Sequence, residues 1–245
     1  MLRYLPLALL FAGGVAVAAD PPKDQKPKYE TREQHDPDGI GKFYQGREIA
    51  LVMGHRVAGW LERPEREKEE APTKLLKALA LKEGMTVADV GAGSGYHAFR
   101  MAKEVGETGK ILAVDIQQEM LDLMAARKKK DKVENVELVL GTDKDPKLPA
   151  GKVDLILMVD VYHELEFPHE MGEKLVAALK PGGRLVFVEF RLEDDAVPIK
   201  LVHKMSERQV MKEMAEFKEL DHKTTVKTLP WQHVIVFEKV KGEKK

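Results

Sequence analysis

The chain has 245 residues, a formal net charge of −1 and no cysteine. Its hydrophobic fraction of 43% is enough to bury a core, and its charged fraction of 33% suits a solvent-exposed surface. The small net charge excludes the strong positive field that attracts nucleic acid, so we expect no nucleic-acid partner. The lack of cysteine excludes disulfides and a lipid anchor attached to cysteine.

The first 19 residues have the pattern of a secretory signal peptide. Arg3 gives a positive start, residues 4–19 form an apolar run, and the run ends in small residues. A membrane-spanning helix usually needs about 20 apolar residues, so this run is short for a span. We expect cleavage near Ala18 or Ala19, a periplasmic or secreted protein, and no stable membrane span after cleavage. An uncleaved membrane anchor is the alternative.

Two segments separate this leader from the main domain. Residues 20–40 are rich in proline and charge and poor in apolar side chains, which predicts a disordered linker. In residues 41–71, large side chains recur with helical spacing and predict a helical lid, broken near Gly54. They are Ile49, Val52, Met53, Arg56, Val57 and Trp60.

The main domain is expected over residues 72–240, followed by a disordered tail at 241–245. Strands and helices alternate along it, which predicts a parallel sheet with helices on both faces. Ser206 and Gln209 have the spacing of a capping box, so a helix is expected to begin there. Strands are expected at 86–90, 111–115, 136–140, 153–159 and 184–190, and helices at 96–104, 117–129 and 168–179.

A glycine-rich turn follows the first of these strands, in the sequence VADVGAGSGY from Val87 to Tyr96. Glycine lacks a Cβ, so such a turn brings bare backbone against a ligand. The spacing is GxGxG, whereas a dinucleotide pyrophosphate requires GxGxxG, and Tyr96 stands where that last glycine would be. On its own, the turn is also compatible with a plain tight turn.

Acidic residues follow the later strands. Asp115 ends the second strand, where a doubly wound fold presents a carboxylate to a ribose diol. Thr142 and Asp143 follow the third strand, and Asp160 follows the fourth. The segment Leu179–Gly183, with the sequence LKPGG, precedes the fifth strand. Ligands of such sheets bind outside the carboxyl ends of the strands, so these acids are expected to share one site.

Together these features resemble the class I S-adenosylmethionine-dependent methyltransferases, over roughly residues 72–240. The resemblance implies a doubly wound α/β fold with a seven-stranded, mostly parallel, Rossmann-like sheet, here with an N-terminal helical extension. It implies that segments 218–227 and 232–240 complete the sheet antiparallel. It also implies that the glycine turn holds the methionine part of the cofactor, Asp115 the ribose, and Asp143 the adenine. The cofactor-binding residues are expected to be Asp89, Gly91, Ala92, Gly93, Gly95, Asp115, Ile116, Thr142, Asp143 and Asp160.

The acceptor is expected beside the fourth strand end, where the catalytic candidates are Asp160, Tyr162, His163 and Glu164. Methyl transfer needs an aligned nucleophile about 3 Å from the methyl carbon, and some acceptors also need a general base. A structural role for His163, with Glu164 in solvent, is one alternative. A metal site formed by His163, Glu164 and His169 is another, but we expect no metal.

Other side chains are weaker candidates for the same cavity. His97 could point into the cofactor pocket or cover the first helical turn. The lid could bring Tyr44, Arg47, His55 or Arg56 toward the substrate, and Lys200 and His203 could border the pocket from the loop after the fifth strand.

The expected function is transfer of a methyl group from S-adenosylmethionine to an unidentified small-molecule acceptor. An exported protein that binds the cofactor without catalysis is an alternative. A nicotinamide-dependent oxidoreductase is a third, disfavoured by the glycine spacing and the LKPGG turn. The acceptor and the oligomeric state do not follow from the residues.

Overall fold

The structure is a computed structural model that describes residues 28–241. The predicted signal peptide with its cleavage site, the start of the predicted linker, and residues 242–245 of the predicted tail lie outside the described residues. Within residues 28–241, no helix is long and apolar enough to cross a membrane.

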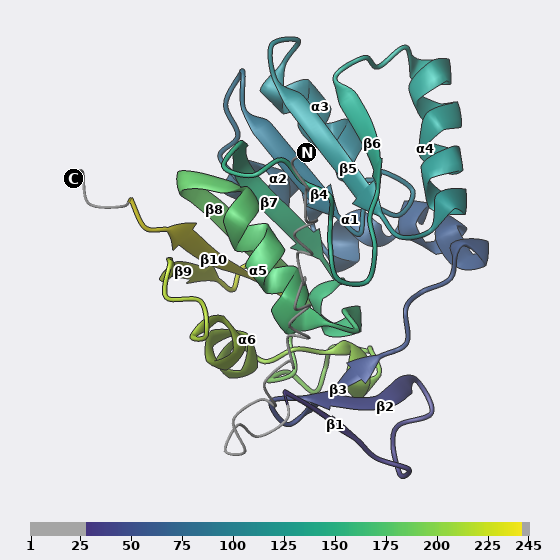
Figure 1. The fold of residues 1–245 in the computed structure, drawn as a ribbon. Helices are drawn as coiled ribbons and strands as arrows, with labels where there is room; N and C mark the ends of the chain where they lie inside the picture. The colour runs from purple at the N-terminus through teal and green to yellow at the C-terminus, as the bar shows by residue number, and fades with distance from the viewer. Residues whose placement is uncertain (1–27, 242–245) are drawn as a thin grey trace, which may run out of the picture.

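The main domain is built on a seven-stranded sheet with the order β6-β5-β4-β7-β8-β10-β9, as Figure 1 shows. The first five strands in this order are parallel, whereas β10 is antiparallel to β8 and to β9. This confirms the predicted methyltransferase-type fold. The strands are β4 (Thr86–Val90), β5 (Lys110–Asp115), β6 (Val136–Leu140), β7 (Val153–Val159), β8 (Leu179–Phe190), β9 (Leu220–Val226) and β10 (Gln232–Lys239).

Helices cover both faces of the sheet, because its central strands carry apolar side chains on both sides. In β7, Ile156 packs in the cluster that contains α5 and α6, while Leu155 and Leu157 pack in the cluster that contains α2, α3 and α4. The helices are α2 (Pro72–Ala78), α3 (Ala98–Val105), α4 (Gln118–Asp131), α5 (Pro168–Ala178) and α6 (Glu207–Met214). The predicted cap of α6 is present, since the Ser206 side chain accepts from the Gln209 backbone N–H.

The N-terminal region differs from the prediction. A three-stranded antiparallel sheet, β1-β2-β3, occupies part of the predicted linker and the first part of the predicted helical lid. Gln45 and Gly46 both have positive φ, 48° and 95°, which is the backbone of a two-residue hairpin turn. Helical structure begins only afterwards, so the lid is a strand hairpin followed by short helices. These elements are β1 (Tyr29–Thr31), β2 (Gly39–Tyr44), β3 (Arg47–Ala50), the 3-10 helix η1 (His55–Glu62) and α1 (Arg66–Glu69).

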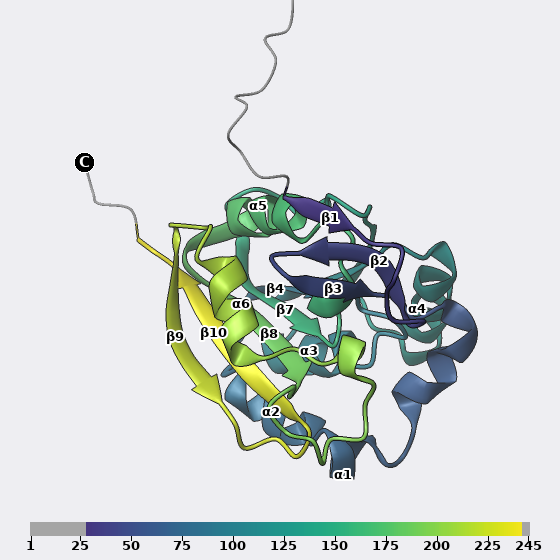
Figure 2. The same cartoon turned by 90° about the horizontal axis from the view of Figure 1, so that it is seen from below.

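The small sheet lies across the carboxyl ends of the central strands, as Figures 1 and 2 together show. A buried ion pair attaches it to the core: Arg47 Nε lies 2.7 Å from Glu213 Oε1 on α6, and the Glu213 side chain is fully buried. The Arg47 guanidinium also donates to the carbonyl of His163, at 3.2 Å. The N-terminal sheet therefore covers the edge at which the predicted site residues gather.

Candidate functional site

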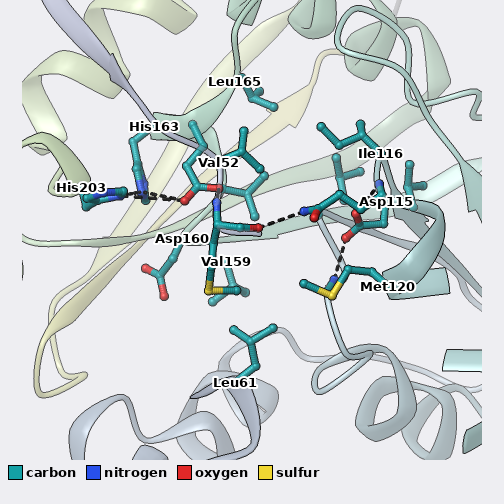
Figure 3. A pocket seen from close by; sticks show the side chains of 18 of the residues that line it. Val52, Leu61, Asp115, Ile116, Met120, Val159, Asp160, His163, Leu165 and His203 are labelled. Carbon is teal, nitrogen blue, oxygen red and sulfur yellow. Dashed lines mark hydrogen bonds and ion pairs between the residues drawn. The ribbon is translucent and has the colours of Figure 1, made fainter. Parts of the chain in front are cut away.

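A cavity of about 670 Å³ opens at the carboxyl ends of β4, β5 and β7, beneath the N-terminal region. This volume is in the range typical of small-molecule sites. Figure 3 shows Asp115 and Ile116 on one side of the cavity and His163 and His203 on the other, with Leu61 across from them. The lining therefore has two distinct ends.

The glycine turn after β4 forms one wall. Gly91 has φ of +73°, and a Cβ on it would lie 2.4 Å from Val161 Cγ2. Gly93 has φ of +54°, and a Cβ there would lie 2.6 Å from Leu61 Cδ1. Backbone conformation favours glycine at both positions, and at Gly91 the β-branched Val161 also leaves no space for a Cβ. Gly91 and Gly93 line the cavity, but Ala92 and Gly95 do not.

Asp115 is a largely buried carboxylate at the end of β5. One of its oxygens accepts the backbone N–H of Gly93 at 2.8 Å, and the other accepts that of Gln117 at 2.9 Å. Burial raises the pKa of Asp115, although these two hydrogen bonds oppose the effect. Each carboxylate oxygen has a second lone pair, so Asp115 can still accept two hydrogen bonds from a ligand.

An uncovered apolar surface lies beside Asp115. Ile116 lines the cavity and is 47% exposed, and Trp60 of η1 lines it and is 42% exposed. Thr142 and Asp143, at the end of β6, add polar groups to this side. A ligand with a flat apolar ring and polar edges could bind there, with the ring against the apolar side chains and its edges near the polar groups.

Two acids each carry a buried carboxylate oxygen without a hydrogen-bond partner among the described residues. They are Asp89, in β4, and Asp160, which lines the cavity just after β7. Gln232 donates to the other oxygen of Asp160 at 2.6 Å. Burial raises the pKa of Asp89 to about 7, and burial together with Glu70 and Glu189 raises that of Asp160. A buried polar atom without a partner indicates a missing donor, and Asp160 is among the residues that line the cavity, so Asp160 is a ligand contact candidate.

The opposite end of the cavity is a cluster of two histidines and two glutamates. His163, in the 3-10 helix η2 (Tyr162–Glu164), places Nδ1 2.6 Å from an oxygen of the fully buried Glu189 on β8. This contact favours a proton on Nδ1, so in the neutral ring Nε2 carries the lone pair. His163 Nε2 lies 3.2 Å from His203 Nδ1, and Glu164 Oε1 lies 3.9 Å and 3.8 Å from these two nitrogens.

The cluster has perturbed proton affinities. Burial alone would lower the pKa of His163, but the charge and hydrogen bond of Glu189 outweigh it and raise the pKa. Burial and the neighbouring His163 lower the pKa of His203. Burial raises the pKa of Glu164 to about 7. Groups poised near neutral pH in a cavity are characteristic of functional sites.

Several predicted residues lie elsewhere. Tyr162 does not line the cavity: its hydroxyl donates to Glu213 at 2.7 Å and its ring packs edge-on against Phe187 in the core. His169 is bonded to Glu216 and is not part of the histidine cluster. Asp89 and His97 are buried behind the lining. Tyr44, Arg47, His55 and Arg56 do not line the cavity, whereas Lys200 and His203 do.

The sequence did not indicate how the lid is attached. The Gln117 side chain donates to the Met53 carbonyl and accepts the His55 backbone N–H, both at 2.9 Å. The Met53 N–H also contacts Glu164 Oε2, at 3.4 Å. Glu189 was missed as well, although a charged residue in the apolar run of β8 was a visible signal.

Comparisons with known proteins agree with this architecture. The family model described as "Methyltransferase domain" matches residues 81–239, more than half of the chain. A solved S-adenosylmethionine-dependent methyltransferase from Aquifex aeolicus is 29% identical, with a TM-score of 0.72, covering 77% of this chain and 100% of that one.

Two relatives act on different molecules, by their names. A demethylmenaquinone methyltransferase of Lactococcus lactis is 25% identical over 47% of this chain and 46% of its own length. A tRNA U34 carboxymethyltransferase of Pseudoalteromonas translucida is 33% identical over 50% of this chain and 37% of its own length. The match therefore spans less than half of each of these relatives.

Proposed function

The chain belongs to the class I S-adenosylmethionine-dependent methyltransferase family, and on that basis we propose that it transfers a methyl group to a small molecule. The observation that carries this proposal is the cavity itself. It joins the glycine turn and Asp115 to the cluster around His163 in one space. A donor held at one end can therefore meet an acceptor held at the other.

The described residues fit the cofactor. The methionine part would lie against the bare backbone of Gly91 and Gly93, with the unpartnered oxygen of Asp160 available to its ammonium group. Asp115 would accept from the ribose hydroxyls. Ile116 offers an uncovered apolar face for the adenine, with Asp143 beside it.

The bound cofactor supplies an activated methyl group, so the protein has mainly to align the acceptor. The acceptor side is formed by Asp160, His163 and Glu164, with His203. We assign His203 to the acceptor side in place of Tyr162, because Tyr162 does not line the cavity and His203 does. Glu189 acts as a positioning residue, because it fixes the ring orientation and proton of His163.

The covering of the cavity supports a small acceptor. Met53 and Trp60 line it from the lid, and Pro198 and Ile199 line it from the loop after β8. A space of about 670 Å³ suits the cofactor and one compact molecule.

Calorimetry with the purified chain tests the binding step. We expect micromolar binding of S-adenosylmethionine and of S-adenosylhomocysteine, and no binding of NADH. If neither S-adenosylmethionine nor S-adenosylhomocysteine binds, the proposal is refuted. Methyl-labelled cofactor added to a cell extract then tests the transfer. Label should enter the small-molecule fraction, whereas label in protein or RNA, or no label at all, would contradict a small-molecule methyltransferase.

We also propose that residues 1–19 direct export, from their composition. In a fractionated producing cell, the mature chain should be in the exported fraction and begin at Ala19 or Asp20 by mass spectrometry. A full-length chain recovered with the cytoplasmic fraction would contradict export.

A further inference from the structure

We propose that His163, Glu164 and His203 bind one divalent transition-metal ion of the zinc type at the acceptor end of the cavity. One nitrogen from each histidine and one oxygen from Glu164 lie within 4.8 Å of one another. Figure 3 shows His163 and His203 converging on one side of the cavity. The ion would be a new component of this site, since the cofactor needs no metal for binding.

The spacing of the three atoms suits a metal ion. In a tetrahedral zinc site with Zn–N bonds of about 2.0–2.1 Å, neighbouring ligand atoms lie about 3.3 Å apart. The two histidine nitrogens are 3.2 Å apart. Glu164 Oε1 lies 3.9 Å and 3.8 Å from them, so the carboxylate has to move by roughly 0.5 Å. Both nitrogens can ligate if the proton of His203 is on Nε2.

The surroundings of His163 have the arrangement that metal sites use. A ligating histidine usually donates its other ring N–H to a carboxylate, which fixes the ring and increases its basicity. Glu189 has this role here, at 2.6 Å from Nδ1, and its side chain is fully buried. Its second oxygen accepts the backbone N–H of Tyr162 at 2.9 Å, so Glu189 is itself held in place.

Charge balance also favours a cation. Glu164 and Glu189 are both largely buried, and in residues 28–241 their ion pairs within 4 Å are with histidines and with no lysine or arginine. With neutral histidines the cluster has up to two negative charges, which a divalent ion neutralises. Imidazole and carboxylate ligands suit zinc, iron or cobalt, whereas magnesium prefers oxygen ligands alone.

Three protein ligands leave at least one coordination position open toward the cavity. This part of the inference depends on the proposed function: an oxygen of the acceptor would occupy that position. A hydroxyl bound to the ion loses its proton to water more readily, and its oxygen then forms the bond to the methyl carbon as the sulfur–carbon bond breaks. Such an ion would select acceptors that carry a metal-binding hydroxyl.

Metal titration tests the site without the cofactor. The full chain, without a histidine tag and treated with EDTA, is titrated at pH 7.5 with Zn²⁺, Co²⁺ and Mg²⁺. We expect one Zn²⁺ or Co²⁺ per chain with micromolar or tighter affinity, a visible Co²⁺ spectrum, and no Mg²⁺ binding. Binding should release protons, because Glu164 and the histidines must be deprotonated.

Variants locate the ion. His203→Ala and the isosteric Glu164→Gln should each weaken Zn²⁺ binding by at least tenfold, while His222→Gln, on the exposed strand β9, should leave it unchanged. Zn²⁺ affinity unchanged in both cluster variants, or no binding tighter than millimolar, would overturn the metal site. S-adenosylhomocysteine binding is measured separately. If it is absent while Zn²⁺ binds, the proposed function fails and the metal site holds.

Discussion

Replacing Asp115 by asparagine tests the donor end of the cavity. In the native chain each carboxylate oxygen accepts one backbone N–H, from Gly93 at 2.8 Å and from Gln117 at 2.9 Å. The side-chain amide has only one oxygen, so its NH₂ group must face one of these two donors. The substitution keeps the volume but removes the charge and one acceptor site, and the cofactor's ribose then has a poorer partner.

The expected loss follows from these contacts. A hydrogen bond to a charged group contributes about 1.5–3 kcal/mol, and one to a neutral group about 0.5–1.5 kcal/mol. Losing one ribose hydrogen bond and weakening the other by about 1 kcal/mol therefore costs about 2.5–4 kcal/mol of binding. The Kd should rise roughly 70- to 900-fold.

Isothermal calorimetry with S-adenosylmethionine and S-adenosylhomocysteine measures this change. Both ligands carry the same ribose, so Asp115→Asn should weaken them by the same factor. Asp122→Asn is the matched control, because Asp122 is exposed on α4 and, within residues 28–241, its side chain bonds only to Gln118. Thermal unfolding without ligand checks that the variant is folded. A folded Asp115→Asn chain with Kd within threefold of the native value would refute the placement of the ribose.

Three further substitutions test the fold around the site by urea unfolding. Gly91→Ala should lower the free energy of unfolding by at least about 2 kcal/mol, because alanine disfavours the left-handed backbone and its Cβ overpacks the site. Gly151→Ala is the control: its φ is also positive but the space around it is open, so the loss should be smaller. Equal losses would contradict the steric argument. Asp89 holds its proton more tightly when folded, so native stability falls as pH rises from about 4 to about 7. The stability of Asp89→Asn relative to the native chain should therefore increase by about 2–3 kcal/mol between pH 5 and pH 8. A stability difference that does not change with pH would exclude a raised pKa for Asp89. Arg47→Met leaves the buried Glu213 without its counter-charge and should cost about 3–5 kcal/mol of unfolding free energy. A loss below 1 kcal/mol would show that the pair does not hold the N-terminal sheet.

The central sheet could be predicted because its strands are short apolar runs that end in acids or glycines. The predicted strands at 86–90, 136–140 and 153–159 agree with β4, β6 and β7 at every residue. Burial on both faces makes the runs of β4 and β7 distinct from the amphipathic helices between them, whereas β6, at the edge of the sheet, is partly exposed.

The N-terminal region shows where periodicity misleads. Ile49, Val52 and Trp60 have helical spacing, yet Ile49 lies in a strand and is buried, and Val52 lies outside the helices. Trp60 does lie in a helix, η1, as the spacing predicted. The better signal was local: Gln45-Gly46 sits between two β-prone segments, and a two-residue loop with positive φ at both positions forms a hairpin. Glycine is favoured at such a turn, so the turn signal predicts the local structure here better than the spacing of the large side chains does.

The histidine cluster required the topology as well as the residues. The strands β7 and β8 are adjacent and parallel, with Val159 paired to Val188, so the residues that follow them meet at one edge. Glu189 thereby reaches the segment that carries His163, and the loop after β8 returns past the same edge to bring His203 in. No sequence motif links positions 163, 189 and 203. Parallel order places the ends of β7 and β8 together whatever their distance along the chain, which brings Glu189 to His163. His203 lies beyond the end of β8 and reaches them only through the path of the following loop.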